Sequence, residues 1–350
     1  MAGRAFHEEA FVRRFYVIVR QGLAFVPVRW YNGTMNISTF VENDSFDPCY
    51  NQALEEFVFE RASGNDAILM LWRNDPAVVC GCYQNVYAEV NILRAAELGV
   101  AVVRRESGGG AVYHDRGNVN YTFICPAGDA IDYAAMIGPI VSALNAMGVP
   151  AEMNRTSDIA VNGLKVSGSA QKVKKGKLLH HGTLLYDVNL TRLHELADGQ
   201  RGRFVSKGVQ SLPWPVANIR QSLGHGAPDT EAFAARLREL LAPKAKAVRL
   251  TPADEAAVHA LADKKYRSWD WTCGRSPAFT HEAAFLLNDL PVTFTCSARR
   301  GVIEDISFDA DVPILAEAKR LLIGARLAID EVRARLAGLD GLENLKRELF

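Results

Sequence analysis

Residues 164–188 read LKVSGSAQKVKKGKLLHHGTLLYDV, and this stretch decides the fold class of the chain. It predicts two strands, and the basic tetrapeptide at 174–177 predicts a tight turn between them. Asn162-Gly163, just before the stretch, is a strong hairpin signal. Strands that follow one another as hairpins form a mixed or antiparallel sheet rather than a doubly wound one. The strands expected here are Ala151–Arg155, Leu164–Val173 and Leu178–Val188.

Strand-like and helix-like runs alternate through the rest of the chain, without an internal repeat. Asp47 and Pro48 are typical of an N-cap and a first helical position, and the apolar residues that follow keep helical spacing. Asp132 predicts the start of a long helix that ends at Gly148. The expected fold class is therefore α+β, with mixed or antiparallel sheets packed against helices. We also expect strands at Ala67–Trp72, Ala77–Cys82, Ala101–Val103 and Val119–Cys125, and a helix at Val90–Leu98.

The length of 350 residues suggests two domains. Thr251 and Asp254 resemble a capping box with Pro252 at the first helical position, so we expect a boundary near residue 250. Met35 opens a cleaner pattern than the residues before it. The expected division is an N-terminal extension at 1–34, a larger domain at 35–250 and a small α+β domain at 251–350.

Composition and charge narrow the class of protein. Hydrophobic residues make up 49% and charged residues 23%, as in ordinary soluble globular proteins. Lys plus Arg and Asp plus Glu both number 40, and this balance argues against a general nucleic-acid binder. Arg20 and Gln21 interrupt the apolar run Phe15–Val28, so no membrane-spanning segment is expected.

The six cysteines are too sparse for a disulfide framework in a chain of this length. Cys80 and Cys82 form a C-x-C pair, for which zinc binding is a minor alternative to two small residues on one face of a strand. Reduced thiols suit a cytoplasmic protein.

A glycine-rich segment runs from Arg104 to Asp115 and reads RRESGGGAVYHD. Three successive glycines let the backbone approach a ligand closely, and exposed N–H groups there can hold anionic oxygens. Arg104 and Arg105 add charge and forked donors. The spacing fits neither a Walker A loop nor a dinucleotide fingerprint. A structural bend is the alternative interpretation.

Two further segments carry polar groups on predicted strands. Lys165 lies among small residues that leave room for a ligand, and a fixed ammonium there could stabilise charge on a phosphate or acyl oxygen. His180 and His181 are adjacent and point to opposite faces, so they cannot grip one metal together. One of them could orient a ligand or relay a proton, and a buried structural histidine is the alternative. The lysines at 172, 174, 175 and 177 form either a solvated turn or a patch that steers an acidic partner.

Taken together, these segments resemble lipoate–protein ligase, the bacterial enzyme related to biotin protein ligase, from about Met35 to the C-terminus. The most specific motif runs from Arg104 to Asp115 and continues with Gly117-Asn118. The other stretches that carry the resemblance are 47–56, 71–74, 84–85, 165–170, 180–185 and, for the accessory C-terminal domain of longer members, 269–279. Several motifs in the same order at compatible spacing make the resemblance strong.

The resemblance implies a two-step reaction in which lipoate is adenylated by ATP and the lipoyl group then passes to a lysine of an acceptor domain. It implies that the catalytic residue is Lys165, touching both the phosphate and the lipoyl carbonyl oxygen. The implied adenylate-binding residues are Arg105, Gly110, Ala111, Val112, Tyr113 and Lys165, and the implied lipoate-binding residues are Lys165, His181 and Gly182. Mg²⁺ would bridge phosphate oxygens, with Asp158 as a possible contact.

The implied partners are lipoate or octanoate and an acceptor: a lipoyl domain of a 2-oxoacid dehydrogenase acyltransferase subunit or the glycine-cleavage H protein. No nucleic-acid or membrane partner is expected, and the protein is expected to act as a monomer in the cytoplasm. Two positions depart from the family pattern, because Ser157 stands where Asn is frequent and Cys82 where a basic residue is frequent. Neither removes the arginine, glycine and lysine groups.

Three alternative functions stay open at this point. The first is an ATP-independent octanoyl- or lipoyltransferase, which would need a cysteine thioester; Cys125 is the thiol of the central region, and Gly182 stands where some relatives carry cysteine. The second is a biotin ligase with a DNA-binding arm, for which residues 1–34 are too short. The third is a non-catalytic lipoyl-binding regulator.

Overall fold

The structure is a computed structural model that describes residues 30–31, 34–128, 132–154, 157–197 and 203–350. Its centre is an eight-stranded sheet in the order β14-β3-β4-β8-β12-β11-β10-β9. β14, β3 and β4 pair in parallel and the other neighbours pair antiparallel, so the sheet is mixed, as the hairpins predicted. The strands are β3 (Thr39–Val41), β4 (Ile68–Trp72), β8 (Asn118–Pro126), β9 (Ala151–Asn154), β10 (Asp158–Val161), β11 (Leu164–Lys174), β12 (Lys177–Leu185) and β14 (Lys246–Val248).

A three-stranded sheet in the order β6-β5-β7 forms a second layer beside the large one. The glycine-rich segment links β6 to β7, and the turn after β5 leads into two short helices. This sheet therefore presents the glycines at one of its ends. The elements are β5 (Ala77–Cys80), α2 (Val86–Glu89), α3 (Ile92–Glu97), β6 (Ala101–Arg104) and β7 (Val112–His114).

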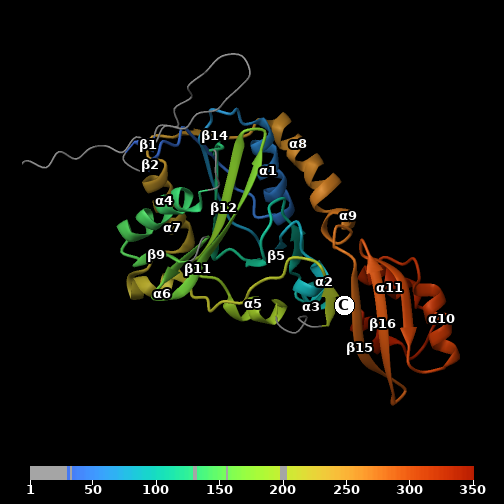
Figure 1. Cartoon of the computed structure of the whole chain (residues 1–350). Coiled ribbons are helices and arrows are strands. Elements are labelled where there is room, and N and C mark those ends of the chain that lie inside the picture. The colour runs from blue at the N-terminus through green and yellow to red at the C-terminus, as the bar shows by residue number, and fades with distance from the viewer. Residues whose placement is uncertain (1–29, 32–33, 129–131, 155–156, 198–202) are drawn as a thin grey trace, which may run out of the picture.

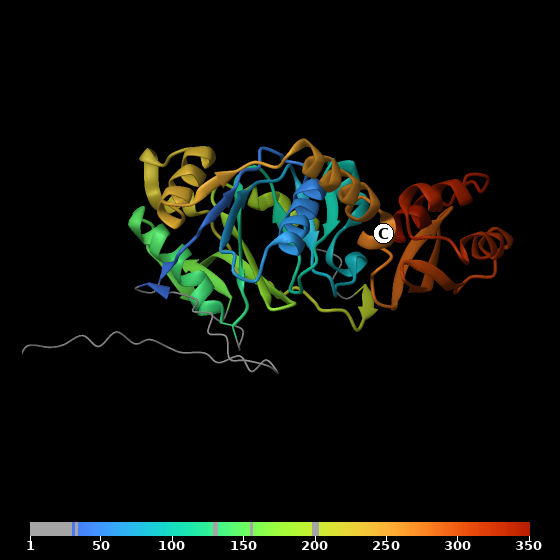
Figure 2. The same ribbon diagram turned by 90° about the horizontal axis from the view of Figure 1, so that it is seen from above.

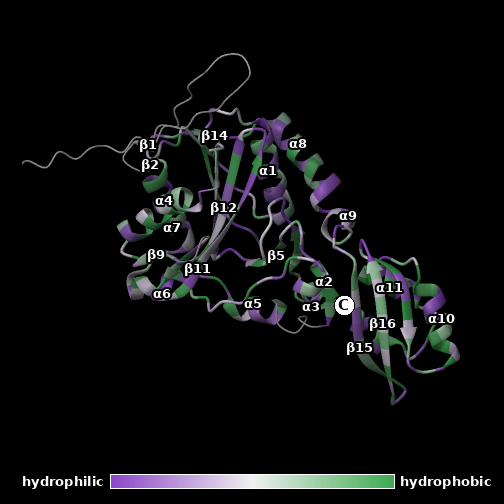
Figure 3. Ribbon diagram, in the orientation of Figure 1, coloured by the Kyte–Doolittle hydropathy of each residue, from purple (hydrophilic) through white to green (hydrophobic). Residues whose placement is uncertain are grey.

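Helices cover the two faces of the large sheet (Figure 1). α4 (Tyr133–Ala146) and α7 (Thr230–Leu241) pack on one face, and α1 (Pro48–Arg61) packs on the other. Local chemistry starts α1 as the sequence predicted, because the Asp47 side chain accepts hydrogen bonds from the backbone N–H groups of Cys49 and Tyr50. Figure 3 shows that purple and green residues alternate on outer helices, as expected where one side meets the core.

The C-terminal part of the chain forms a separate four-stranded sheet in the order β13-β15-β16-β17 with helices packed on it. It lies at one end of the molecule in both views (Figure 1 and Figure 2). Its edge strand β13 comes from before residue 250 and pairs with β15, so this sheet is not built from one continuous segment. The elements are β13 (Phe204–Ser206), β15 (Phe279–Leu287), β16 (Leu290–Arg299), β17 (Val302–Phe308), α10 (Pro313–Leu322), α11 (Ile329–Arg335) and α12 (Glu343–Glu348).

The segment 252–272 packs on the larger part of the molecule. α8 (Pro252–Leu261) and a π-helical turn (Ala262–Tyr266) bury apolar side chains in the same cluster as α1. α9 (Trp269–Thr272) is tied to β6, because Trp271 Nε1 donates to Arg104 O at 2.7 Å. The division of the chain near residue 250 stays a prediction, and this packing favours a division closer to residue 278.

The remaining described elements connect these layers. None of the helices within the described ranges is both long and apolar enough to span a membrane. The expected extension at 1–34 lies outside the described residues except for a short hairpin at its end. The connecting elements are β1 (Trp30–Tyr31), β2 (Thr34–Met35), α5 (Leu190–Ala197), α6 (Ile219–Leu223) and a 3₁₀ turn (Gly224–Gly226).

Candidate active site

A row of polar residues crosses the face of the large sheet that α1 covers. Asp158 on β10 opposes Gly168 on β11, and the Gly168 N–H donates to Thr183 Oγ1 on β12 at 3.3 Å. Thr183 opposes Asn120 on β8, which opposes Trp72 on β4. Residues opposite one another across paired strands share a face of the sheet. A buried polar surface therefore runs across the middle of the sheet.

Lys165 lies at the β11 end of this row. Its Nζ is 2.9 Å from Asp158 Oδ1, and the side chain keeps 27% exposure. It extends over Gly168, where a side chain would place its Cβ 3.1 Å from the Lys165 Nζ. The backbone is fixed from outside the sheet, because Lys165 N donates to Pro215 O and Ala217 N donates to Lys165 O, both at 3.0 Å. Among the described residues the ammonium thus has a single carboxylate partner, and it remains accessible.

Arg105 braces the glycine-rich loop from within. Its guanidinium is buried and donates to Ser107 Oγ at 3.0 Å, Val79 O at 3.0 Å, Gly108 O at 2.6 Å and Gly110 O at 2.8 Å. Burial lowers the pKa of Arg105 from its ordinary value. Since the loop carbonyls turn inward to meet this cation, they fix the course of the glycines.

The glycine-rich loop fills the space between the two sheets. Gly109 has φ +89°, a conformation that glycine adopts easily. A Cβ on Gly81, in the turn after β5, would lie 2.1 Å from Gly109 O. On its other side the loop meets β11, because a Cβ on Gly109 would lie 3.9 Å from the Cβ of Ala170. The loop therefore packs against β11, the strand that also carries Lys165.

A chain of buried hydrogen bonds lies deeper between these layers. His181 Nε2 is 2.6 Å from Ser107 Oγ, and its Nδ1 is 2.9 Å from both carboxylate oxygens of Glu55 on α1. Thr122 Oγ1 donates to Glu55 Oε1 at 2.6 Å and accepts from Trp72 Nε1 at 3.0 Å. Burial raises the pKa of Glu55, but His181 and Thr122 outweigh it and hold that pKa below its ordinary value.

A small cavity adjoins this chain. Glu106 of the loop forms ion pairs there with Lys172 of β11 and with Lys265 of the π-helical turn, and Lys265 also reaches Glu56 at 2.8 Å. Burial lowers the pKa of both lysines. The turn after α8 thereby closes the back of the loop. The lining residues are Glu55, Glu56, Phe59, Glu106, Ser107, Lys172, Leu179, His181 and Tyr266.

His114 completes the buried polar groups. Asn74 Nδ2 lies 3.0 Å from its Nδ1, while its Nε2 has no hydrogen-bond partner among the described residues. Burial, with Arg105 and His181 nearby, lowers the pKa of His114 to about 3, so the ring is neutral. Sequence reasoning had assigned no role to His114, Ser107 or Glu55. The adjacent His-Asp pair at the end of the glycine motif was the signal that could have indicated the first.

The other residues implied by the resemblance divide between the two faces of the sheet. Position 182 faces the side of the sheet that α4 covers, and only glycine fits there, because a Cβ would lie 2.4 Å from the hydroxyl oxygen of Tyr121. His180 opposes Gln171 on β11, and His180 Nδ1 lies 2.9 Å from Gln171 Nε2. Burial lowers the pKa of His180 to about 3. Of the adjacent histidines, His181 is therefore the one on the site face. Tyr113 is buried among apolar side chains, so its ring is part of the core.

Asp158 does not form part of a preformed metal cluster. Its carboxylate is engaged by Lys165, and within the described ranges no three His, Cys, Asp or Glu side chains gather in a way that could hold a metal ion. The described residues around Asp158 therefore do not form a Mg²⁺ site made of protein ligands alone.

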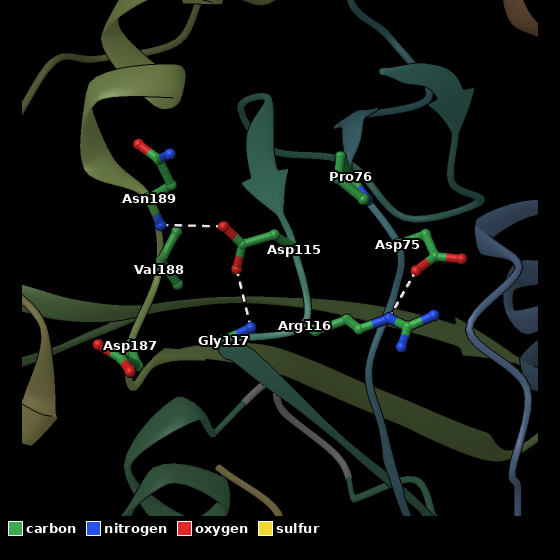
Figure 4. Close-up of a pocket in the computed structure, with 8 residues that line it drawn as sticks. All are labelled: Asp75, Pro76, Asp115, Arg116, Gly117, Asp187, Val188 and Asn189. Atoms are coloured by element: carbon green, nitrogen blue, oxygen red, sulfur yellow. Dashed lines mark hydrogen bonds and ion pairs between the residues drawn. The ribbon is translucent and has the colours of Figure 1, made fainter. Parts of the chain in front are cut away.

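A separate surface cavity (Figure 4) is lined neither by Lys165 nor by the three successive glycines of the motif. Asp115 accepts from the N–H groups of Gly117 and Asn189, and Arg116 pairs with Asp75 at 2.7 Å. The carboxylates of Asp75 and Asp115 therefore hold the connecting segments around the cavity in place. The lining residues are Asp75, Pro76, Asp115, Arg116, Gly117, Asp187, Val188 and Asn189.

The basic turn at 174–177 caps a helix. Lys177 Nζ donates to the carbonyl groups of Glu60 at 3.0 Å and Ala62 at 2.9 Å, at the C-terminus of α1. Lys174 pairs with the Glu60 side chain at 2.7 Å. Lys174 and Lys177 are therefore engaged within the protein. In this turn, Lys175 is the exposed lysine left to attract an acidic partner.

Comparison with known proteins identifies the family. Residues 47–242 match the model of the lipoyl protein ligase A/B catalytic domain. The lipoate-protein ligase LplJ of Bacillus subtilis is 32% identical over 313 residues, which are 86% of this chain and 94% of that protein. The chain belongs to the lipoyl protein ligase family. Lipoate–protein ligase 1 of Staphylococcus aureus is 30% identical over 308 residues, with the same shares covered.

Solved structures agree with this family at the level of the fold. A lipoate protein ligase from T. acidophilum has a TM-score of 0.56 at 24% identity, covering 68% of this chain and 99% of that one. P. falciparum LipL1, solved in complex with lipoate, has a TM-score of 0.56 at 23% identity and covers 87% and 95%. The α+β fold expected from the sequence is confirmed.

Proposed function

We propose that this member of the family is an ATP-dependent lipoate–protein ligase that works through a lipoyl-adenylate. The observation that carries the proposal is the convergence of the accessible Lys165 ammonium and the glycine-rich loop on one polar region of the sheet. The names of the relatives support it, since LplJ and the S. aureus protein are lipoate–protein ligases, and a lipoate-protein ligase A has been solved with ATP.

In the first half-reaction an oxygen of the lipoate carboxylate attacks the α-phosphorus of ATP. The new P–O bond forms as the bond to the β-phosphate oxygen breaks, and pyrophosphate leaves. Negative charge gathers on the α-phosphate oxygens, where a positioned cation stabilises the transition state. Lys165 supplies that cation. The backbone of Gly110, Ala111, Val112 and Tyr113, held in shape by Arg105, lines the adenylate, while the Ala111 N–H itself donates to Ser211 Oγ.

In the second half-reaction a neutral lysine amine of the acceptor attacks the acyl carbon. The amide C–N bond forms, the bond from the acyl carbon to the phosphate oxygen breaks, AMP leaves, and the amine gives its extra proton to solvent. Lys165 acts again, because its ammonium can pair with the lipoyl carbonyl oxygen as charge builds there. His181 orients the lipoyl group, and its own orientation is set by Glu55 and Ser107.

The same proposal covers the metal ion, the acceptor protein and the acyl group. Mg²⁺ would arrive bound to the phosphates of ATP, and Asp158, whose carboxylate is paired with Lys165, is not assigned to hold it. The acceptor is a lipoyl domain of a 2-oxoacid dehydrogenase acyltransferase subunit or the glycine-cleavage H protein. The acyl group is lipoate or octanoate, and the protein works as a monomer in the cytoplasm, with catalytic residues at 35–250 and an accessory domain after them.

A cysteine-dependent transferase is disfavoured by the position of Cys125. Its side chain is buried with Met136 and Leu178, and burial raises its pKa to about 11. A thiol must ionise to act as a nucleophile, so this environment works against a thioester mechanism.

The test is pyrophosphate release from ATP with lipoate, octanoate or biotin, followed by mass measurement of an acceptor domain. We expect release with lipoate or octanoate but not biotin, and one acyl group added to the acceptor only when ATP is present. Acyl transfer without ATP would replace the proposal with a transferase. Binding of lipoate without pyrophosphate release would replace it with a regulator.

A further inference from the structure

One segment outside the motifs, residues 204–217, contacts both Lys165 and the glycine-rich loop, and we call it the strap. Its first residues form β13, which pairs with β15 of the C-terminal sheet. Its last residues pair with Lys165, whose backbone exchanges hydrogen bonds with Pro215 O and Ala217 N. The strap therefore runs from the C-terminal sheet to the proposed catalytic lysine.

Ser211, at the middle of the strap, holds the glycine-rich loop. Its Oγ accepts from the backbone N–H of Ala111 at 2.8 Å and from Gln84 Nε2 at 3.1 Å. Gln84 in turn accepts from the N–H of Gly81 at 2.8 Å, so one hydroxyl connects the loop to the turn after β5. The fit is close, because a Cβ on Gly110 would lie 3.0 Å from Ser211 Oγ.

Ser211 is itself anchored by a buried carboxylate. Its N–H donates to Glu89 Oε1 at 3.3 Å and Oε2 at 3.2 Å, and Glu89 on α2 is buried. Both oxygens of one buried side chain thus accept from the same N–H group. The hydroxyl is therefore placed by α2 rather than left to the motion of a connecting segment.

We propose that Ser211 is a positioning residue that sets the glycine-rich loop at the correct distance from Lys165 for adenylate formation. The strap is hydrogen-bonded to Ala111 at one point and to Lys165 four residues later, so it acts as a spacer between the two groups that grip the adenylate. The inference rests on the proposed function, since it assigns no chemistry of its own to Ser211.

The test compares Ser211→Ala with Ser222→Ala, a partly buried serine on α6 whose hydroxyl donates to Ile219 O at 2.7 Å. The assay is lipoate-dependent exchange of pyrophosphate into ATP by the full chain. Since small misplacements of reacting groups cost up to about 100-fold, we expect Ser211→Ala to lower kcat by about 10-fold to 100-fold. The KM for lipoate and the midpoint of thermal unfolding should match those of Ser222→Ala.

A second variant tests the anchoring. Glu89→Gln should give the same kind of loss, and the double variant with Ser211→Ala should lose less than the product of the two, because both act through one contact. Exchange by Ser211→Ala equal to that of Ser222→Ala would overturn the inference. So would a loss accompanied by a lower unfolding midpoint or a higher KM for lipoate, or multiplicative losses in the double variant. An inactive wild-type chain would instead refute the proposed function itself.

Discussion

The site lies between the glycine-rich segment 104–115, here called the loop wall, and the β11–β12 hairpin, here called the strand wall. These two walls hold their cations in opposite ways. On the loop wall Arg105 is buried, and its donors are taken up by a serine hydroxyl and three backbone carbonyls of the protein. On the strand wall Lys165 has one carboxylate partner within the described part of the chain and keeps 27% exposure. A cation whose donors are already used shapes its surroundings, whereas one with free donors can respond to charge that develops in a reaction.

The largest expected effect tests the strand wall. Lys165→Ala removes the accessible cation, and loss of one positioned charge-stabilising group lowers rates by about 10²-fold to 10³-fold. Pyrophosphate exchange with lipoate measures the loss. Lys175→Ala, in the exposed turn of the same hairpin, is the matched control and should keep the wild-type rate. Near-normal turnover by Lys165→Ala would remove Lys165 from its assigned role.

The next effect tests the loop wall. Arg105→Lys keeps the charge but cannot meet four acceptors with fork geometry, so the loop loses its shape. We expect exchange to fall by about 10-fold to 100-fold, because the loop amides are then misplaced. Arg116→Lys, at an exposed arginine with one carboxylate partner, is the control. If Arg105→Lys behaves like that control, charge rather than bracing is what matters at this position.

The structure also divides the elements that sequence could predict from those it could not. α1 begins at Pro48 as expected, because Asp47 caps it with groups two and three residues away. β10 (Asp158–Val161) was not among the expected strands, although the hairpin signal at Asn162-Gly163 implies a strand before it, because it has only four residues and its pairing with β9 and β11 depends on the whole sheet. A helix cap can be predicted from neighbouring residues in the sequence, whereas a short strand depends on the strands with which it pairs.

The same distinction applies to the site. Lys165 and the glycines were identified because each carries its own chemistry in a short motif. Glu55 was quoted as part of a helix and given no role, since its contact with His181 joins residues 126 positions apart. Ser211 shows no motif at all, and only its contact with Ala111, 100 positions away, gives it significance.

A smaller effect tests the far face of the strand wall. Gly182→Ala would place a methyl group 2.4 Å from the Tyr121 hydroxyl oxygen, so the packing against α4 must shift. Overpacking of this kind lowers the free energy of unfolding by about 1–3 kcal/mol. Urea unfolding measures it, with Gly64→Ala as the control, because Gly64 lies in a turn and nothing lies within 4 Å of a Cβ there. Unchanged stability in Gly182→Ala would show that this glycine serves the site face instead.

The smallest expected effect is the contribution of one buried histidine on each wall to the pH dependence of the unfolding free energy. Burial lowers the pKa of His114 on the loop wall and of His180 on the strand wall to about 3, from an ordinary value of 6.5. Between these values the unfolded chain binds more protons than the folded one, so stability is complete above pH 6.5 and falls as the pH drops toward 3. Each histidine should therefore remove about 1 kcal/mol of unfolding free energy between pH 6 and pH 5.

Urea unfolding of the wild type and of His180→Gln at pH 7, 6 and 5 measures this difference. The variant lacks one titrating group, so its stability should fall by about 1 kcal/mol less than that of the wild type between pH 6 and pH 5. His225→Gln, at an exposed histidine, should keep the wild-type dependence. The pH stays at 5 or above because Glu55, whose pKa is lowered, gains its proton only in more acidic solution. If the unfolding free energies of the wild type and of His180→Gln fall by the same amount between pH 6 and pH 5, His180 is not held neutral by burial. The histidines of the two walls would then differ in their protonation.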